Sequence, residues 1–141
     1  MIDIANIKSV WPGNYDEVWA VVRSMKSNPK HLRQVQDLSP STALFHDYLN
    51  WKKAGKFDGA MFDKNYVPRF ISELKMNPDA RALLNKLYKM DKAGKRIALV
   101  CYCDNEWLCH RSILAGLLRG AGCKVNTNVS FIWYWDQWRA Q

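Results

Sequence analysis

Long apolar runs are missing from this sequence, and none reaches the length needed to span a membrane. The N-terminus also lacks the basic and then apolar layout of a secretory signal, since Asp3 follows Ile2. Internal repeats, low-complexity tracts and linkers are absent as well. With 141 residues, 48% of them hydrophobic, the chain has the usual size of one domain. We therefore expect residues 1–141 to form a single domain in the cytoplasm, with no membrane partner.

Acidic residues are fewer than basic ones: the chain has 13 Asp and Glu and 21 Lys and Arg, which gives a net charge of +8. Most of the excess lies in residues 61–141, which carry 13 basic and 7 acidic groups. This balance favours an anionic partner, either a small molecule such as a nucleotide or a nucleic acid. The alternative is a basic surface that only keeps the protein soluble. On one predicted helix, the candidate nucleic-acid contacts are Lys86, Lys89 and Lys92.

The order of apolar and helical patterns predicts the fold class. The stretch "RIALVCYC", residues 96–103, is apolar on both alternating faces, which is typical of a central strand in a parallel sheet. We expect further strands at residues 1–11, 32–35 and 124–125, and helices at 14–25, 42–54, 62–76, 77–93 and 109–118. Because strands and helices alternate, the predicted fold is a small Rossmann-like three-layer α/β domain with a mainly parallel sheet flanked by helices.

Three of the four cysteines and one of the three histidines lie in a single segment, "CYCDNEWLCHR", residues 101–111. In parallel α/β sheets ligands bind beyond the carboxyl ends of the strands, where the next helix begins. A helix N-terminus attracts anions and lowers the pKa of a thiol, so Cys109 is the predicted nucleophile or thiolate acceptor and His110 the proton carrier. Arg111 would hold an anion with its planar guanidinium, with Cys101 beneath the site. The alternative is structural: Cys101 and Cys103 fill the core, and His110 caps the helix.

Two narrower signatures are missing from this segment. Cys-based phosphatases and rhodaneses need a cysteine and an arginine at the ends of a short loop of fixed length, and neither Cys103 nor Cys109 has that spacing to Arg111. A zinc site of Cys101, Cys103, Cys109 and His110 has enough ligands, but the paired short spacing of zinc ribbons is absent. The sequence thus predicts reduced thiols, no metal and no other cofactor.

The same segment resembles a known family. "IALVCYCDNEWLCHRSILAGLL" is similar to the hallmark of the domain of unknown function 488 family, in which a strand ending in Leu-Leu-Cys and an acidic residue leads to Cys-His-Arg at a helix start. "SVWPGN", "LSPSTALFHDYLNWKKAGKFDGAMF" and "RFISEL" resemble the YeaO-like branch of that family, so the resemblance spans residues 7–122. It implies a small α/β fold in an intracellular setting, and the matched site residues are Cys101, Cys109, His110 and Arg111.

Two positions depart from the family pattern. Asn14 follows "WPG", where the branch places arginine before the glycine, and Cys103 stands where many members have glutamate. Asp104 or Glu106 could take the place of that carboxylate. The predicted ligand-binding residues around the Cys-His-Arg group are Trp11, Cys103, Asp104, Glu106 and Ser112.

Tryptophan is frequent, with seven in the chain, and "FIWYWDQW" near the C-terminus holds three of them. We expect segment 129–141, as a strand or a helix, to dock on the domain, on a second copy in a homodimer or on a protein partner. The alternative is that its rings stack on bases beside the basic surface.

These features predict an enzyme or sensor that acts on a nucleotide or nucleic-acid constituent at a Cys-His-Arg anion-binding site. Two alternatives remain open at this point. The first is a non-catalytic nucleic-acid-binding protein that uses the three helix lysines and exposed tryptophans. The second is a small inhibitor or adaptor protein, of the kind that phages encode, whose aromatic end binds a partner.

Overall fold

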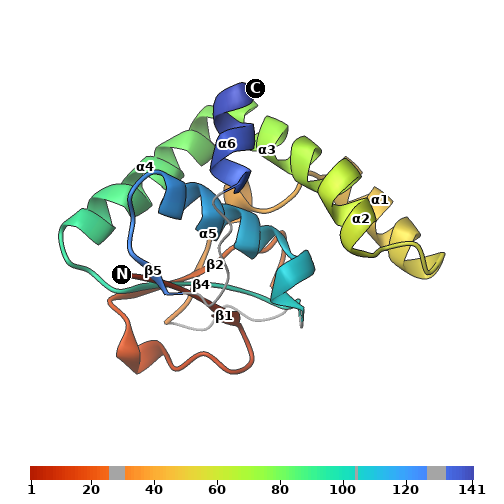
Figure 1. Cartoon of the computed structure of the whole chain (residues 1–141). Coiled ribbons are helices and arrows are strands. Elements are labelled where there is room, and N and C mark those ends of the chain that lie inside the picture. Colours follow the sequence, from red (N-terminus) through yellow and green to blue (C-terminus); the bar gives the residue numbers. More distant parts are fainter. Residues whose placement is uncertain (26–30, 104, 127–132) are drawn as a thin grey trace.

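The centre of the protein is a sheet of five parallel strands (Figure 1). The computed structural model describes residues 1–25, 31–103, 105–126 and 133–141. The strand order is β3-β2-β4-β1-β5, and the strands are β1 (Ile2–Asn6), β2 (Glu17–Ala20), β3 (Arg33–Gln34), β4 (Ile97–Cys101) and β5 (Val125–Asn126). The predicted Rossmann-like α/β fold is confirmed. Because all the strands are parallel, their carboxyl ends meet at one edge of the sheet.

β4 lies in the middle of this sheet and carries the first cysteine of the site. It pairs with β1, where Asn6 is opposite Cys101, and with β2, where Ala20 is opposite Val100. All five of its residues are buried, as expected for a strand that is apolar on both faces. Cys101 is therefore held at the carboxyl end of a buried strand in the middle of the sheet.

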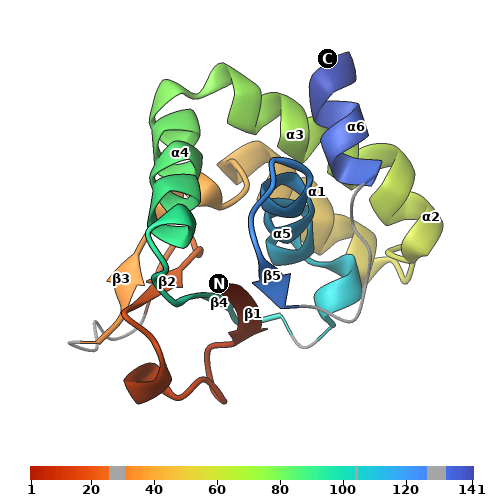
Figure 2. The same ribbon diagram turned by 60° about the vertical axis from the view of Figure 1, so that its left-hand side comes forward.

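The helices form a layer on the sheet. In both views α3, α4, α5 and α6 lie on one face, whereas the segment between β1 and β2 lies on the other (Figures 1 and 2). Among the described helices, none has the length and hydrophobicity that crossing a membrane requires.

The helices are α1 (Thr42–Lys53), α2 (Gly59–Met61), α3 (Val67–Met76), α4 (Pro78–Lys92), α5 (His110–Gly120) and α6 (Trp133–Ala140). The shorter turns are the π-helical turn η3 (Phe62–Tyr66) and the 3-10 turns η1 (Pro12–Asn14), η2 (Gln36–Leu38) and η4 (Glu106–Leu108).

The helix predicted through Met25 was wrong, because residues 17–20 form strand β2. Val18 and Trp19 are buried, and β2 lies between β3 and β4. A continuous apolar run of valines and a tryptophan suits a strand buried on both faces, and pairing with β4 overrides the helical spacing that the same residues also satisfy. The strand expected at residues 32–35 is confirmed as β3.

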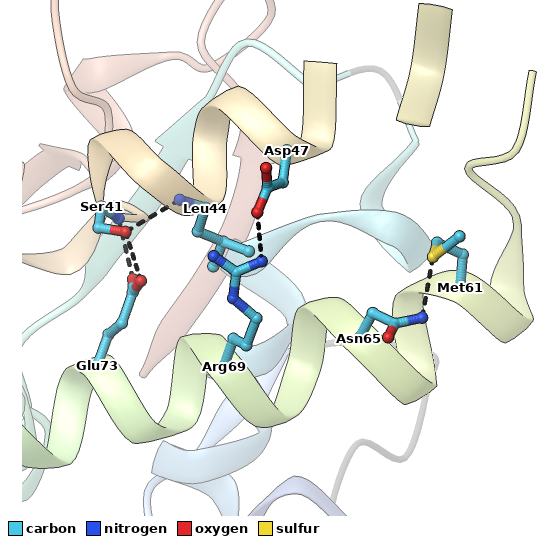
Figure 3. A network of polar contacts seen from close by, with 7 residues as sticks. All are labelled: Ser41, Leu44, Asp47, Met61, Asn65, Arg69 and Glu73. Atoms are coloured by element: carbon cyan, nitrogen blue, oxygen red, sulfur yellow. Dashed lines mark hydrogen bonds and ion pairs between the residues drawn. The ribbon is translucent and has the colours of Figure 1, made fainter. Parts of the chain in front are cut away.

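Polar contacts tie α1 to α3 (Figure 3). Ser41 caps α1, since its Oγ accepts a hydrogen bond from the Leu44 backbone N–H at 3.1 Å. The Ser41 backbone N–H donates to a Glu73 carboxylate oxygen at 2.9 Å, and the Ser41 hydroxyl donates to the other oxygen. One turn along α3, Arg69 pairs with Asp47 at 2.6 Å. These contacts fix α1 along α3, which matters because α1 forms one wall of the pocket described below.

The C-terminal aromatic segment forms helix α6 rather than a strand, and residues 129–132 of that segment lie outside the described residues. α6 packs against α5 so closely that a Cβ atom added to Gly120 would collide with the Trp135 side chain. Lys75 of α3 donates to the Trp138 carbonyl at 2.8 Å and lies 5.5 Å from the centre of its ring. The described tryptophans of this segment thus pack on their own domain.

Candidate functional site

Four sulfur and nitrogen ligand atoms meet at the carboxyl end of β4. Cys101 ends the strand, Cys103 follows it by two residues, Cys109 is the N-cap of α5 and His110 is the first residue of that helix. The Sγ atoms of the three cysteines and a ring nitrogen of His110 all lie within 4.8 Å of one another. We call these four residues the Cys-His cluster. Residues eight positions apart come together because strand, loop and helix turn back on themselves at this edge of the sheet.

The hydrogen bonds of His110 fix its tautomer. Its Nε2 atom lies 2.5 Å from the Val21 carbonyl oxygen, which can only accept, so Nε2 carries the proton. The other nitrogen, Nδ1, then presents a lone pair to Cys109 Sγ at 3.7 Å. Burial lowers the pKa of His110, which keeps the ring neutral. His110 is thus a buried, oriented acceptor rather than a solvent-facing proton carrier.

The thiolate was predicted to be Cys109, whereas the pKa of Cys101 is the one that its surroundings lower. Hydrogen bonds from Cys103 and Cys109 lower the pKa of Cys101, and the positive charge of Arg111 acts in the same direction. The Sγ atoms of Cys101 and Cys109 are 3.1 Å apart. Burial raises the pKa of Cys109, and its hydrogen bond to Cys101 raises the pKa of Cys103 to about 11. The N-terminal position of Cys109 on α5 is outweighed by its desolvation.

Arg111 lies beneath the cluster. Its side chain is 3% exposed, and Nη1 donates to the Ala5 carbonyl at 2.8 Å and to Cys101 Sγ at 3.3 Å. Within the part of the chain that the structure describes, no carboxylate forms an ion pair with Arg111, and its Nε has no hydrogen-bond partner. The guanidinium therefore links β1 to the end of β4 instead of lining the pocket.

A pocket of about 600 Å³ opens above the Cys-His cluster. Two cations line it, Lys8 just beyond the end of β1 and Arg23 beyond the end of β2, and Arg23 is steadied by donating to the Pro40 carbonyl at 2.8 Å. Its aromatic walls come from α1, η3 and the loop after β4, and they comprise Phe45, Tyr48, Tyr66 and Tyr102. All four cluster residues lie on its lining.

Neither cation of this pocket was among the residues predicted from the sequence. The only signal that could have found them is their position, since each follows the end of a parallel strand, where ligands bind. Arg23 could not be recognised in this way, because residues 14–25 were predicted to be a helix. Without strand β2, no strand end precedes Arg23.

Of the remaining predicted site residues, Trp11 and Ser112 are not brought to the pocket. Trp11 is 71% exposed and lines a separate hollow of about 690 Å³ with residues at the amino-terminal ends of β2 and β3. Ser112 is buried, and its hydroxyl donates to the Cys109 carbonyl at 2.7 Å within the first turn of α5. Asp104 lies outside the described residues, as does the side chain of Glu106.

The three predicted nucleic-acid lysines lie on α4 and are exposed. Lys86 lies 6.0 Å from the centre of the Trp19 ring, and Lys92 donates to the Gly122 carbonyl at 2.7 Å. α4 ends where the chain enters the amino end of β4, which is the edge of the sheet opposite Cys101. These lysines, including Lys89, therefore do not belong to the pocket above the cluster.

Fold and site together define a parallel α/β domain with a cysteine-rich cluster at the carboxyl edge of its sheet. The sequence matches the DUF488-N3a family, described as the active DUF488-N3 subclade, over residues 8–122. The chain belongs to this family, which confirms the resemblance to the domain of unknown function 488. Comparisons with curated proteins and with solved structures gave no match.

Proposed function

We propose that the protein binds an anionic, nucleotide-like molecule in the pocket above the Cys-His cluster and acts on it, or senses it, there. The observation that carries this proposal is the composition of the pocket. Two cations stand at the ends of β1 and β2, aromatic rings line the walls, and the cluster lies on the lining. Phosphate groups bind such cations, and a base stacks on such rings.

The size and position of the pocket support the same proposal. About 600 Å³ is within the usual range for sites that enclose a small molecule. The pocket is at the carboxyl edge of a parallel sheet, which is where open α/β folds bind their ligands. The family description, an active subclade, also favours a chemical role over a purely structural one.

The other two functions predicted from the sequence have less support. Lys86 and Lys92 make contacts within the domain, and Trp135 and Trp138 pack on α5 and α3. Nucleic-acid binding through α4 and an adaptor role of the aromatic end stay predictions.

Calorimetric titration with a nucleoside, its mono- and diphosphates and inorganic phosphate tests the proposed function. We expect the phosphorylated compounds to bind more tightly than the nucleoside. Lys8→Met and Arg23→Met should each weaken their binding by about 10-fold, as the loss of one charge-assisted hydrogen bond of ~1.5 kcal/mol implies. Arg33→Met is the matched control, since it removes the same charge from β3, beside the other hollow.

The proposal fails if none of these compounds binds. It also fails if Lys8→Met and Arg23→Met bind as well as the parent, or if Arg33→Met weakens binding as much as they do. The last result would mean that net charge, rather than this pocket, attracts the ligand.

A further inference from the structure

We propose that Cys101, Cys103, Cys109 and His110 bind one zinc ion as a tetrahedral thiolate and imidazole site beneath the pocket. Sequence spacing argued against a metal, because the paired short spacings of zinc ribbons are absent. Such paired spacings belong to ligands on hairpin turns. Here the ligands come from a strand end, the following loop and a helix start, which converge in space. Three cysteines and one histidine are a standard set of structural zinc ligands.

The cluster has the dimensions of such a site. Ligands at about 2.3 Å from a tetrahedral zinc ion are about 3.8 Å apart. All four ligand atoms lie within 4.8 Å of one another, and the Cys101 and Cys109 Sγ atoms are 3.1 Å apart. Zinc binding needs this closest pair to separate by only about 0.7 Å. Side-chain rotations of that size leave β4 and α5 in place.

His110 is oriented as a metal ligand. Histidines that bind zinc almost always donate their second N–H to a carboxylate, a backbone carbonyl or water, which fixes the tautomer. His110 Nε2 donates to the Val21 carbonyl at 2.5 Å, and its Nδ1 lone pair faces the sulfur atoms. The carbonyl belongs to the residue after β2, so the sheet itself holds the ring in this orientation.

The charge of the surroundings also suits the site. Zinc with three thiolates and a neutral imidazole carries one net negative charge. Arg111 is a buried cation whose Nη1 lies 3.3 Å from Cys101 Sγ, and no carboxylate among the described residues pairs with it. Buried charges require a counter-charge, and the zinc–thiolate group would supply it. Three thiolates favour zinc over magnesium or calcium, which prefer oxygen ligands.

This inference goes beyond the proposed function and does not depend on it. Metal binding involves the floor of the pocket, whereas Lys8 and Arg23 line its walls. Lys8→Met should therefore weaken nucleotide binding and leave the zinc content unchanged, so the two proposals can fail separately.

The test is the metal content of the full chain purified under reducing conditions, followed by cobalt substitution. We expect one zinc per chain. Cobalt in its place should give the thiolate-to-cobalt charge-transfer band and the intense visible bands of a tetrahedral site. Competition with a chelator of known affinity gives the zinc affinity. Cys103→Ser should lower it by at least about 100-fold, which is more than the loss of a hydrogen bond to a ligand causes.

Two variants make the result interpretable. Cys103 is partly exposed, so Cys103→Ser should fold even if Cys101→Ser or Cys109→Ser does not. Cys123→Ser is the matched control, since Cys123 is a buried free cysteine outside the cluster, and this variant should keep the zinc. The proposal is overturned if the reduced parent binds neither zinc nor cobalt. It is also overturned if Cys103→Ser binds zinc as tightly as the parent, or if Cys123→Ser loses it.

Discussion

Replacing Arg111 with methionine tests whether this residue supports the site from below or binds a ligand. The substitution keeps most of the side-chain length but removes the charge and the three Nη1 hydrogen bonds, to the Ala5 carbonyl at 2.8 Å, to Cys101 Sγ at 3.3 Å and to the Cys101 carbonyl at 3.5 Å. A hydrogen bond from a charged donor contributes about 1.5–3 kcal/mol, and a carbonyl left without its buried partner costs about 1–3 kcal/mol. We expect Arg111→Met to lower the free energy of unfolding by about 1.5–3 kcal/mol, because the Ala5 carbonyl loses its donor.

Urea unfolding under reducing conditions, followed by tryptophan fluorescence, measures this change. Lys8→Met is the control, since Lys8 is exposed at the pocket and its replacement should change stability by no more than about 0.5 kcal/mol. A domain of this size is stable by about 5–15 kcal/mol, so the expected loss is a large part of the total.

The opposite result would refute this reasoning. If Arg111 binds a ligand anion, as the sequence alone predicted, Arg111→Met should unfold at the parent's urea concentration and lose only ligand affinity. A loss of stability below about 1 kcal/mol would therefore show that the guanidinium does not link β1 to β4.

Three further predictions concern packing, capping and pH. Gly120→Ala should destabilise the protein by about 1–3 kcal/mol in urea unfolding, because the added Cβ would collide with α6. This cost outweighs the higher helix propensity of alanine. Gly59→Ala is the control: it has open space around it and should be neutral or stabilising. Glu73→Ala should cost about 1–2 kcal/mol in the same assay, since it removes the acceptor that holds the N-cap of α1; an unchanged midpoint would contradict this role. Burial raises the pKa of Tyr15 to about 12, so its contribution to stability should be complete below about pH 10 and be lost from there to about pH 12. The stability difference between the parent and Tyr15→Phe, followed against pH, should narrow only in that range.

Local patterns in the sequence were enough to predict the fold class and the position of the Cys-His cluster in the chain. The apolar run of β4 is typical of a strand buried on both faces, Cys101 ends it, and Cys109 and His110 come after it at the edge where parallel sheets bind ligands. Helix α4 could also be predicted from the sequence. Asn77 caps its first turn and Gly94 ends it, and both effects depend only on neighbouring residues.

The contacts and the pKa shifts of the site residues depend on long-range packing, which local patterns do not show. Residues 17–20 satisfy both helical and strand patterns, and only pairing with β4 selects the strand that brings Arg23 to the pocket. The same holds for the charges: Arg111 contacts Ala5, far away in the sequence, and the desolvation of Cys109 depends on everything packed around it. Local spacing specifies which groups are near one another, but burial and long-range partners determine their protonation and their roles, because both depend on the three-dimensional environment.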